Sequence, residues 1–78
     1  MVVSRKHALK RLCALERNVE EHLQKITDQP GSSSARHWQA EVRSWLLQME
    51  NLLPRVGAKT SADWSAKIAV WKTQLDDR

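Results

Sequence analysis

The sequence has little of what disulfide-rich, membrane-spanning or metal-binding proteins require. Cys13 is the single cysteine among 78 residues, so neither an internal disulfide nor a cysteine-rich metal site can form. No apolar run approaches the roughly 18 residues of a membrane span, and residues 1–10 lack the apolar core of a signal peptide. We therefore expect a soluble protein of the cytoplasm with no membrane association.

Phenylalanine and tyrosine are absent, and glycine and proline occur only twice each. The four tryptophans must then supply the aromatic part of any core, since each can bury roughly 150–250 Å². Gly31 follows Pro30, and Gly57 lies shortly after Pro54, so the chain is divided into three segments by two breaker-rich turns. Its length corresponds to one domain over residues 1–78.

Apolar residues recur every three or four positions in each segment, which is the period of an amphipathic helix. The middle segment has the clearest stripe: Trp38, Val42, Trp45, Met49 and Leu52, with Leu46 and Leu53 beside it. The first segment has Ala8, Leu12, Leu15, Val19 and Ile26, with Leu9 and Leu23 on the flank. The third has Trp64, Ile68, Trp71 and Leu75.

These stripes predict helices over about residues 4–27, 34–53 and 61–76, packed as an all-α, antiparallel three-helix bundle. A hairpin of the first two helices that dimerises would use the same stripes, so the sequence does not separate the two arrangements.

Capping residues set the expected helix ends. Ser4 is a suitable N-cap for the first helix, and Ser33 or Ser34 for the second. Pro54 disfavours α-conformation in the residue before it, so the second helix should end at residue 53. Thr60, followed three residues later by Asp63, resembles a capping box that opens the third helix.

His22 lies on the first stripe, between Val19 and Ile26, where an apolar residue would be expected. We interpret it as a partly buried imidazole that is hydrogen-bonded to a neighbouring group, with a ligand or catalytic role as the alternative.

Two surfaces could receive a protein partner. The outer side of the third helix is smooth and weakly apolar, which lets another helix approach closely, and the second helix carries an outward leucine framed by arginine. The predicted partner-binding residues are Ala62, Ala66, Ala69, Val70, Leu47 and Arg43.

The first helix has a basic face, and the chain carries a net charge of +4. Cations in a first helical turn oppose the helix dipole, so helix stability does not explain them. Lys6, Lys10, Arg11 and Arg17 therefore form a candidate phosphate-binding face. Glu16, Glu20 and Glu21 lie among them, as on an ordinary solvated face, and no aromatic residue interleaves with them for base stacking.

Constellations typical of catalysis are missing. The three histidines do not have the spacing of a zinc-binding helix, and Cys13 and His22 are not a recognisable nucleophile pair. Both glycines belong to turns rather than to a phosphate-binding loop. We expect no enzyme activity, no catalytic or metal site and no cofactor.

One stretch resembles a known family. The segments ALKRLCALE, EEHLQK with His22, the Gln29-Pro30 turn and HWQAEV with Trp38 are similar to a bacterial helical family termed domain of unknown function twenty-nine. The similarity covers residues 8–53. This chain lacks the acidic N-terminal helical half of that family, and its own TSADW segment, residues 60–64, does not match a feature of the family. It implies an all-helical fold with a small His and Trp cluster beside the first turn, and no activity.

Together these features predict a small non-catalytic helical module of the bacterial cytoplasm that binds another protein, with self-association as a further expectation. The alternative is a nucleic-acid-associated accessory protein that uses the basic face of the first helix.

Overall fold

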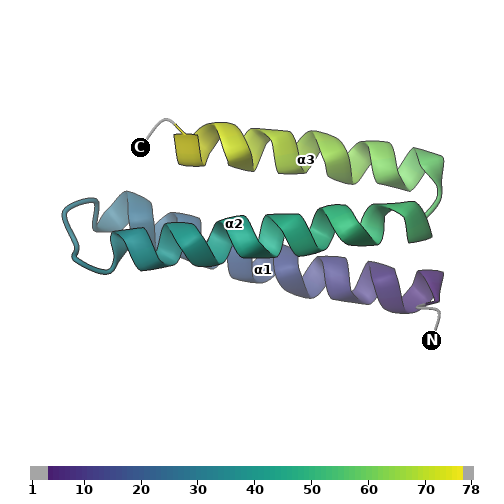
Figure 1. The fold of residues 1–78 in the computed structure, drawn as a ribbon, viewed down its shortest axis with the longest axis horizontal. Coiled ribbons are helices and arrows are strands. Elements are labelled where there is room, and N and C mark those ends of the chain that lie inside the picture. The colour runs from purple at the N-terminus through teal and green to yellow at the C-terminus, as the bar shows by residue number, and fades with distance from the viewer. Residues whose placement is uncertain (1–3, 77–78) are drawn as a thin grey trace.

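A computed structural model describes residues 4–76, and it is entirely helical apart from the connections. The elements are α1 (Arg5–Asp28), α2 (Ala35–Leu52), the short 3₁₀ helix η1 (Leu53–Arg55) and α3 (Ala58–Asp76). α1 and α2 form an antiparallel hairpin, and α3 returns along it antiparallel to α2 (Figure 1). The predicted all-α three-helix bundle is confirmed.

The core lies where the three apolar stripes meet. In α1 and α3 its buried members are those that the periodicity predicts, and Val56 from the second turn joins them. Each large side chain that is fully buried contributes roughly 1.5–3 kcal/mol. No polar or charged residue is buried among residues 4–76. The buried core residues are Ala8, Leu12, Leu15, Val19, Leu23, Ile26, Val42, Leu46, Met49, Val56, Trp64, Ile68, Trp71 and Leu75.

The stripe of α2 is rotated relative to the prediction. Leu46, expected on its flank, is buried at its centre, whereas Trp38 and Trp45 are only partly buried at its edge. α2 packs against α1 on one side and α3 on the other, so its most enclosed residues lie between the two contacts. Trp38 and Trp45 instead meet Lys25 and His22 of α1.

The first two helix starts agree with the prediction to within one residue. The Ser4 hydroxyl accepts a hydrogen bond of 3.2 Å from the His7 backbone N–H, as an N-cap should. Ser34 occupies the N-cap position of α2 but its side chain makes no capping bond. Its own N–H donates to the Ser32 hydroxyl instead.

The predicted start of α3 is wrong by three residues. The helix begins at Ala58, so Thr60 and Asp63 lie inside it and do not form a capping box at its start. Gly57 adopts a φ of +86°, which glycine accepts without strain, and its carbonyl accepts from the Ser61 N–H at 2.8 Å. The glycine thus turns the chain early enough for the helix to start before the threonine.

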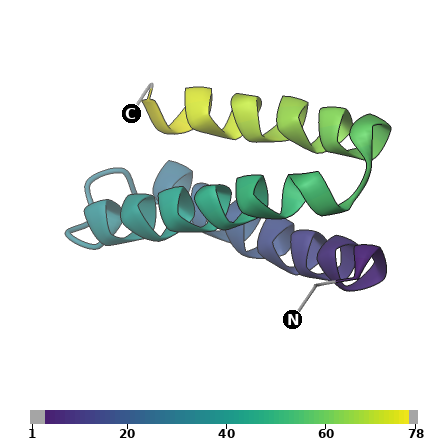
Figure 2. The same ribbon diagram turned by 45° about the vertical axis from the view of Figure 1, so that its right-hand side comes forward.

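η1 and Gly57 make a tight connection, which keeps α2 and α3 side by side along the bundle (Figure 2). Pro54 lies within η1, where its missing N–H removes no α-helical hydrogen bond. The described chain measures 41 × 22 × 14 Å. α1 and α3 begin at the same end of the bundle, whereas the turn between α1 and α2 lies at the other end (Figure 1).

Candidate partner-binding surface

A groove of about 310 Å³ lies between α2 and α3. Its floor includes the buried Leu46, and Leu47 stands beside it with 60% of its surface exposed. The other lining residues are Arg43, Glu50, Lys72 and Asp76. Arg43 and Leu47, which the sequence predicts as partner-binding residues, thus share one groove.

Two ion pairs cross this groove. Arg43 Nη2 lies 3.2 Å from Asp76 Oδ1, and Lys72 Nζ lies 2.7 Å from Glu50 Oε1. All four side chains are substantially exposed, so the pairs contribute at most about 1 kcal/mol each to folding. Their effect is geometric, because they surround an exposed leucine with charges of both signs.

The outer side of α3 is exposed as predicted. Ala62, Ala66 and Ala69 lie in solvent, and Val70 has 55% of its surface exposed. A shallow depression of about 290 Å³ is lined by Ala69, Val70, Thr73 and Gln74. The Thr73 hydroxyl is already bonded to the Ala69 carbonyl at 3.0 Å, so this surface is less polar than its sequence suggests.

Leu47 and Val70 are the exposed large hydrophobic residues of the described chain, and both belong to the predicted partner-binding set. They line two different depressions, one between α2 and α3 and one on α3 itself. The structure therefore divides that set into two patches.

A polar and aromatic cluster joins α1 to α2 near the first turn. Glu41 lies 3.4 Å from His22 Nε2 and 2.6 Å from His37 Nε2 through its two oxygens. The His22 ring meets Trp45 edge to face, with centroids 4.6 Å apart. His22 is 16% exposed, which confirms the prediction of a partly buried imidazole, and the neighbouring group nearest its Nε2 is the Glu41 carboxylate at 3.4 Å.

This cluster also has one unsatisfied atom, the buried His22 Nδ1. Because Nε2 faces a carboxylate, the tautomer with hydrogen on Nε2 fits this geometry, and Nδ1 is then an acceptor without a donor. Within residues 4–76, no group of His, Cys, Asp and Glu is arranged to hold a metal ion. The cluster is therefore best described as a polar clamp between two helices.

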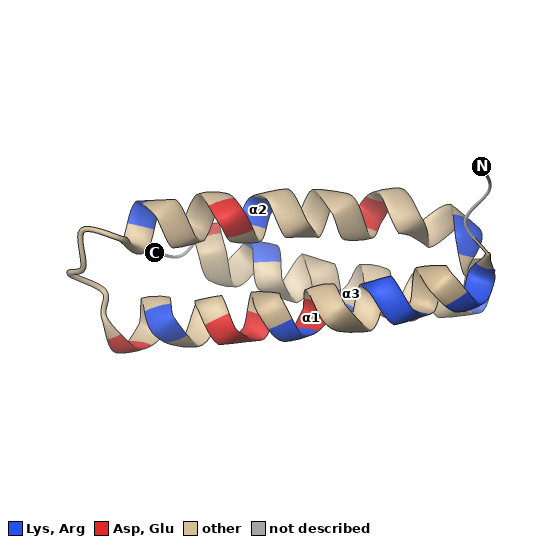
Figure 3. Ribbon diagram, turned by 90° about the horizontal axis from the view of Figure 1, so that it is seen from below, with Lys and Arg blue, Asp and Glu red and all other residues tan. Residues whose placement is uncertain are grey.

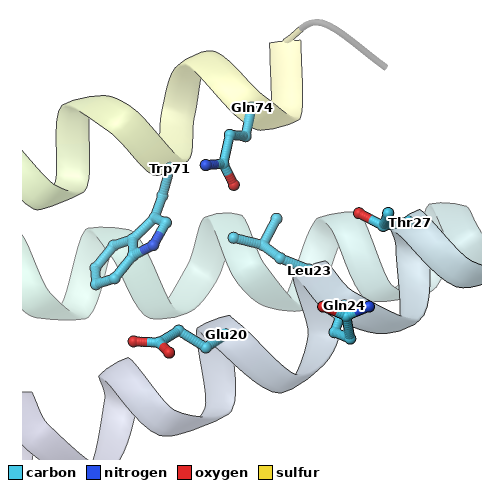
Figure 4. A pocket seen from close by; sticks show the side chains of 6 residues that line it. All are labelled: Glu20, Leu23, Gln24, Thr27, Trp71 and Gln74. Atoms are coloured by element: carbon cyan, nitrogen blue, oxygen red, sulfur yellow. The ribbon is translucent and has the colours of Figure 1, made fainter.

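A depression that the sequence did not predict lies between α1 and α3 and has a volume of about 300 Å³ (Figure 4). It is lined by Glu20, Leu23, Gln24, Thr27, Trp71 and Gln74. A carboxylate, two amides and one indole edge border it, a set suited to hydrogen bonding but without a paired acid and base. The spacing of Glu20, Gln24 and Thr27 beside the α1 stripe was the available signal.

The predicted basic residues of α1 are all exposed. Arg11 donates a hydrogen bond of 3.1 Å to Gln48 of α2, so one of the four is engaged within the fold. Glu16, which the sequence places among them, is instead paired with Lys67 of α3 at 2.9 Å.

Over residues 4–76 the fold and these surfaces define a small all-α three-helix bundle with depressions between α2 and α3 and between α1 and α3. The helices described over residues 4–76 are too short or too polar to cross a membrane. Comparisons with protein-family models, with curated proteins and with solved structures found no match to this chain.

Proposed function

We propose that this protein is a non-catalytic module of the bacterial cytoplasm that binds a partner protein through the groove between α2 and α3. The observation that carries the proposal is the 60% exposure of Leu47 at the edge of that groove. A leucine on a soluble protein is unremarkable by itself. Here it adjoins an apolar floor and is framed by charged residues, which is the pattern of an interface core with a polar rim.

The occupant that fits this groove is one amphipathic helix of the partner. A groove between two helices receives a third through apolar residues spaced three, four or seven positions apart. Arg43 and Lys72 provide positive charge at the rim, and Glu50 and Asp76 provide negative charge. A partner helix with charges of both signs beside its apolar stripe would be held in one orientation.

The outer face of α3 extends the area available to the partner. Ala62, Ala66 and Ala69 have side chains small enough for a second helix to approach closely, and Val70 supplies an apolar contact. A groove alone is small for a stable complex, since specific interfaces bury roughly 800 Å² on each partner. We infer that a tight partner covers both patches.

A photo-reactive amino acid introduced in place of Leu47 tests this proposal in an extract of the native host. We expect a discrete crosslinked protein, and we expect the same protein to be lost when Arg43 is also changed to Glu. The matched control is the reactive group in place of Ala14, an exposed apolar residue of α1.

Leu47→Asp should weaken binding of the recovered partner at least tenfold, whereas Ala14→Asp should leave it unchanged. Equal crosslinking from positions 47 and 14 would contradict the proposal. So would a recovered partner that Leu47→Asp binds normally. Sedimentation of the pure protein distinguishes a second copy of the chain as the occupant, because Leu47→Asp would then convert a dimer to a monomer.

A further inference from the structure

Positive charge is concentrated at one end of the bundle (Figure 3). α1 and α3 both begin there, and η1 lies between them, so two stretches that are distant in sequence come together. Neither residues 4–15 nor residues 51–62 contain Asp or Glu. The basic end consists of Arg5, Lys6, Lys10, Arg11, Arg55 and Lys59. These six charges exceed the net charge of +4 for the whole chain, so the rest of the protein is slightly acidic.

Among the described residues 4–76, five of these cations form no ion pair or side-chain hydrogen bond. The sixth, Arg11, donates to the neutral Gln48. Two of the nearest acids are already paired, Glu50 with Lys72 and Glu16 with Lys67. Asp63 lies one helical turn from Lys59, and no ion pair joins them among residues 4–76. The Arg5 guanidinium lies beside Gly57, which brings the start of α1 against the start of α3.

This arrangement costs stability and so calls for an explanation. Like charges repel, and cations at the first turn of a helix oppose its dipole. α1 and α3 have no acid in their first turns, where acids would be favourable. A bound polyanion would remove both penalties.

The surroundings of the basic end favour phosphate over an acidic protein. Among residues 4–76 the exposed large hydrophobic residues are Leu47 and Val70, and neither belongs to this end. A protein partner normally needs an apolar core in its interface, whereas contacts to phosphates need only cations. No tryptophan is exposed there for base stacking, which favours a duplex over a single strand.

We propose that the basic end binds the phosphate backbone of double-stranded nucleic acid, without sequence preference, through Arg5, Lys6, Lys10, Arg55 and Lys59. This set differs from the basic face that the sequence predicts along α1, which includes Arg17 and lacks Arg55 and Lys59. Arg17 is excluded because it lies two helical turns beyond Lys10, toward the middle of α1 and away from Arg55 and Lys59. Arg55 and Lys59 are included because the fold brings them to the start of α1.

The proposal predicts how strongly binding of the duplex depends on salt concentration. Each phosphate neutralised on a duplex contributes about −0.9 to the slope of log affinity against log salt concentration. Five contacts predict a slope of about −4 to −5. Removing one contact should make the slope less negative by about 0.9 and weaken binding about tenfold at 50 mM salt.

The experiment is a fluorescence anisotropy titration of a labelled 20-base-pair duplex between 25 and 200 mM salt. We expect Lys59→Gln and Arg55→Gln to lose one contact each and Arg17→Gln, the matched control, to bind like the wild type. Circular dichroism melting checks that every variant is folded. Leu47→Asp should also bind the duplex normally, which separates this proposal from that of a protein partner in the groove.

Three results would overturn the proposal: no binding at 25 mM salt, an equal effect of Arg17→Gln and Lys59→Gln, or a slope that Lys59→Gln does not change. Two competitors, polyglutamate and a single strand, test other ligands for the basic end. If polyglutamate displaces the labelled duplex at lower concentrations than unlabelled duplex does, the basic end binds an acidic protein instead. Stronger binding of a single strand of the same length would contradict the choice of a duplex.

Discussion

Lys67 of α3 donates a hydrogen bond of 2.9 Å to Glu16 of α1, and its ammonium lies 4.6 Å from the centroid of the Trp64 ring. The hydrogen bond to Glu16 raises the pKa of Lys67 above its ordinary value, and the carboxylates of Glu16 and Glu20 add to this through their charge. α1 and α3 are separated by the whole of α2 in the sequence. This pair is a polar link between them at the bundle surface.

The link predicts a pH dependence on the alkaline side. Because folding raises the pKa of Lys67, its contribution is fully present below the unfolded value of 10.5 and is lost as pH rises through the higher folded value. The melting temperature of the wild type should therefore fall more between pH 10 and 12 than that of Lys67→Met. Glu16→Gln removes the partner and should flatten the curve similarly. Parallel curves for all three proteins would contradict the link. The size should be modest, at most about 1 kcal/mol, as for other exposed pairs.

Met49 and Leu47 lie two residues apart on α2 and should respond very differently to truncation. Met49 is completely buried, so Met49→Ala leaves a cavity and should lower the free energy of unfolding by about 2–5 kcal/mol. Leu47 is 60% exposed, so Leu47→Ala should change it by about 0.5 kcal/mol or less. Urea denaturation followed by circular dichroism measures both. A large loss for Leu47→Ala would place that side chain in the core and remove the basis for the groove proposal.

The two glycines should differ in their tolerance of alanine. Gly57 has a φ of +86°, a left-handed conformation that costs other residues about 1–2 kcal/mol. A Cβ there would meet only the Arg5 guanidinium at an ordinary 3.6 Å, so the backbone rather than crowding is the cause. Gly31 has no positive φ and open space around it, so Gly31→Ala should be neutral or stabilise by up to about 1 kcal/mol. Equal thermal shifts for the two variants would show that the turn before α3 does not require glycine.

Ser4 and Ser34 both precede a helix, but only Ser4 caps it with its side chain. Ser4→Ala should therefore cost about 1 kcal/mol, because the His7 N–H loses its acceptor. Ser34→Ala should cost only a few tenths of that, since no side-chain capping bond is lost. Chemical denaturation of the two variants side by side is the measurement. The reverse order would indicate that Ser34, and not Ser4, is the functional cap.

The core residues of α1 and α3 could be predicted because apolar spacing alone determines which side of a helix is buried. The same spacing did not predict that Leu46 would replace Trp45 at the centre of the α2 core. A helix between two neighbours is buried along the line between their contacts, and that line depends on where the neighbours lie. The start of α3 was missed because two local signals competed, and the left-handed Gly57 prevailed over Thr60 and Asp63.

The candidate surfaces likewise include one feature that the sequence predicted and others that depend on the tertiary structure. Leu47 and Val70 lie off the apolar stripes, so their exposure followed from helical periodicity. The groove did not, because it depends on the register that brings Arg43 next to Asp76, 33 residues later. The basic end likewise depends on Arg55 and Lys59 meeting the start of α1.

The sequence by itself determined three amphipathic helices, their antiparallel order and the identity of most buried side chains, since these follow from a period of 3.6 residues and from short connections. Only the tertiary structure decided which charges pair, which lie unpaired together and where a groove opens. Those features arise between helices, and interhelical register and rotation are set by how all the core side chains pack at once.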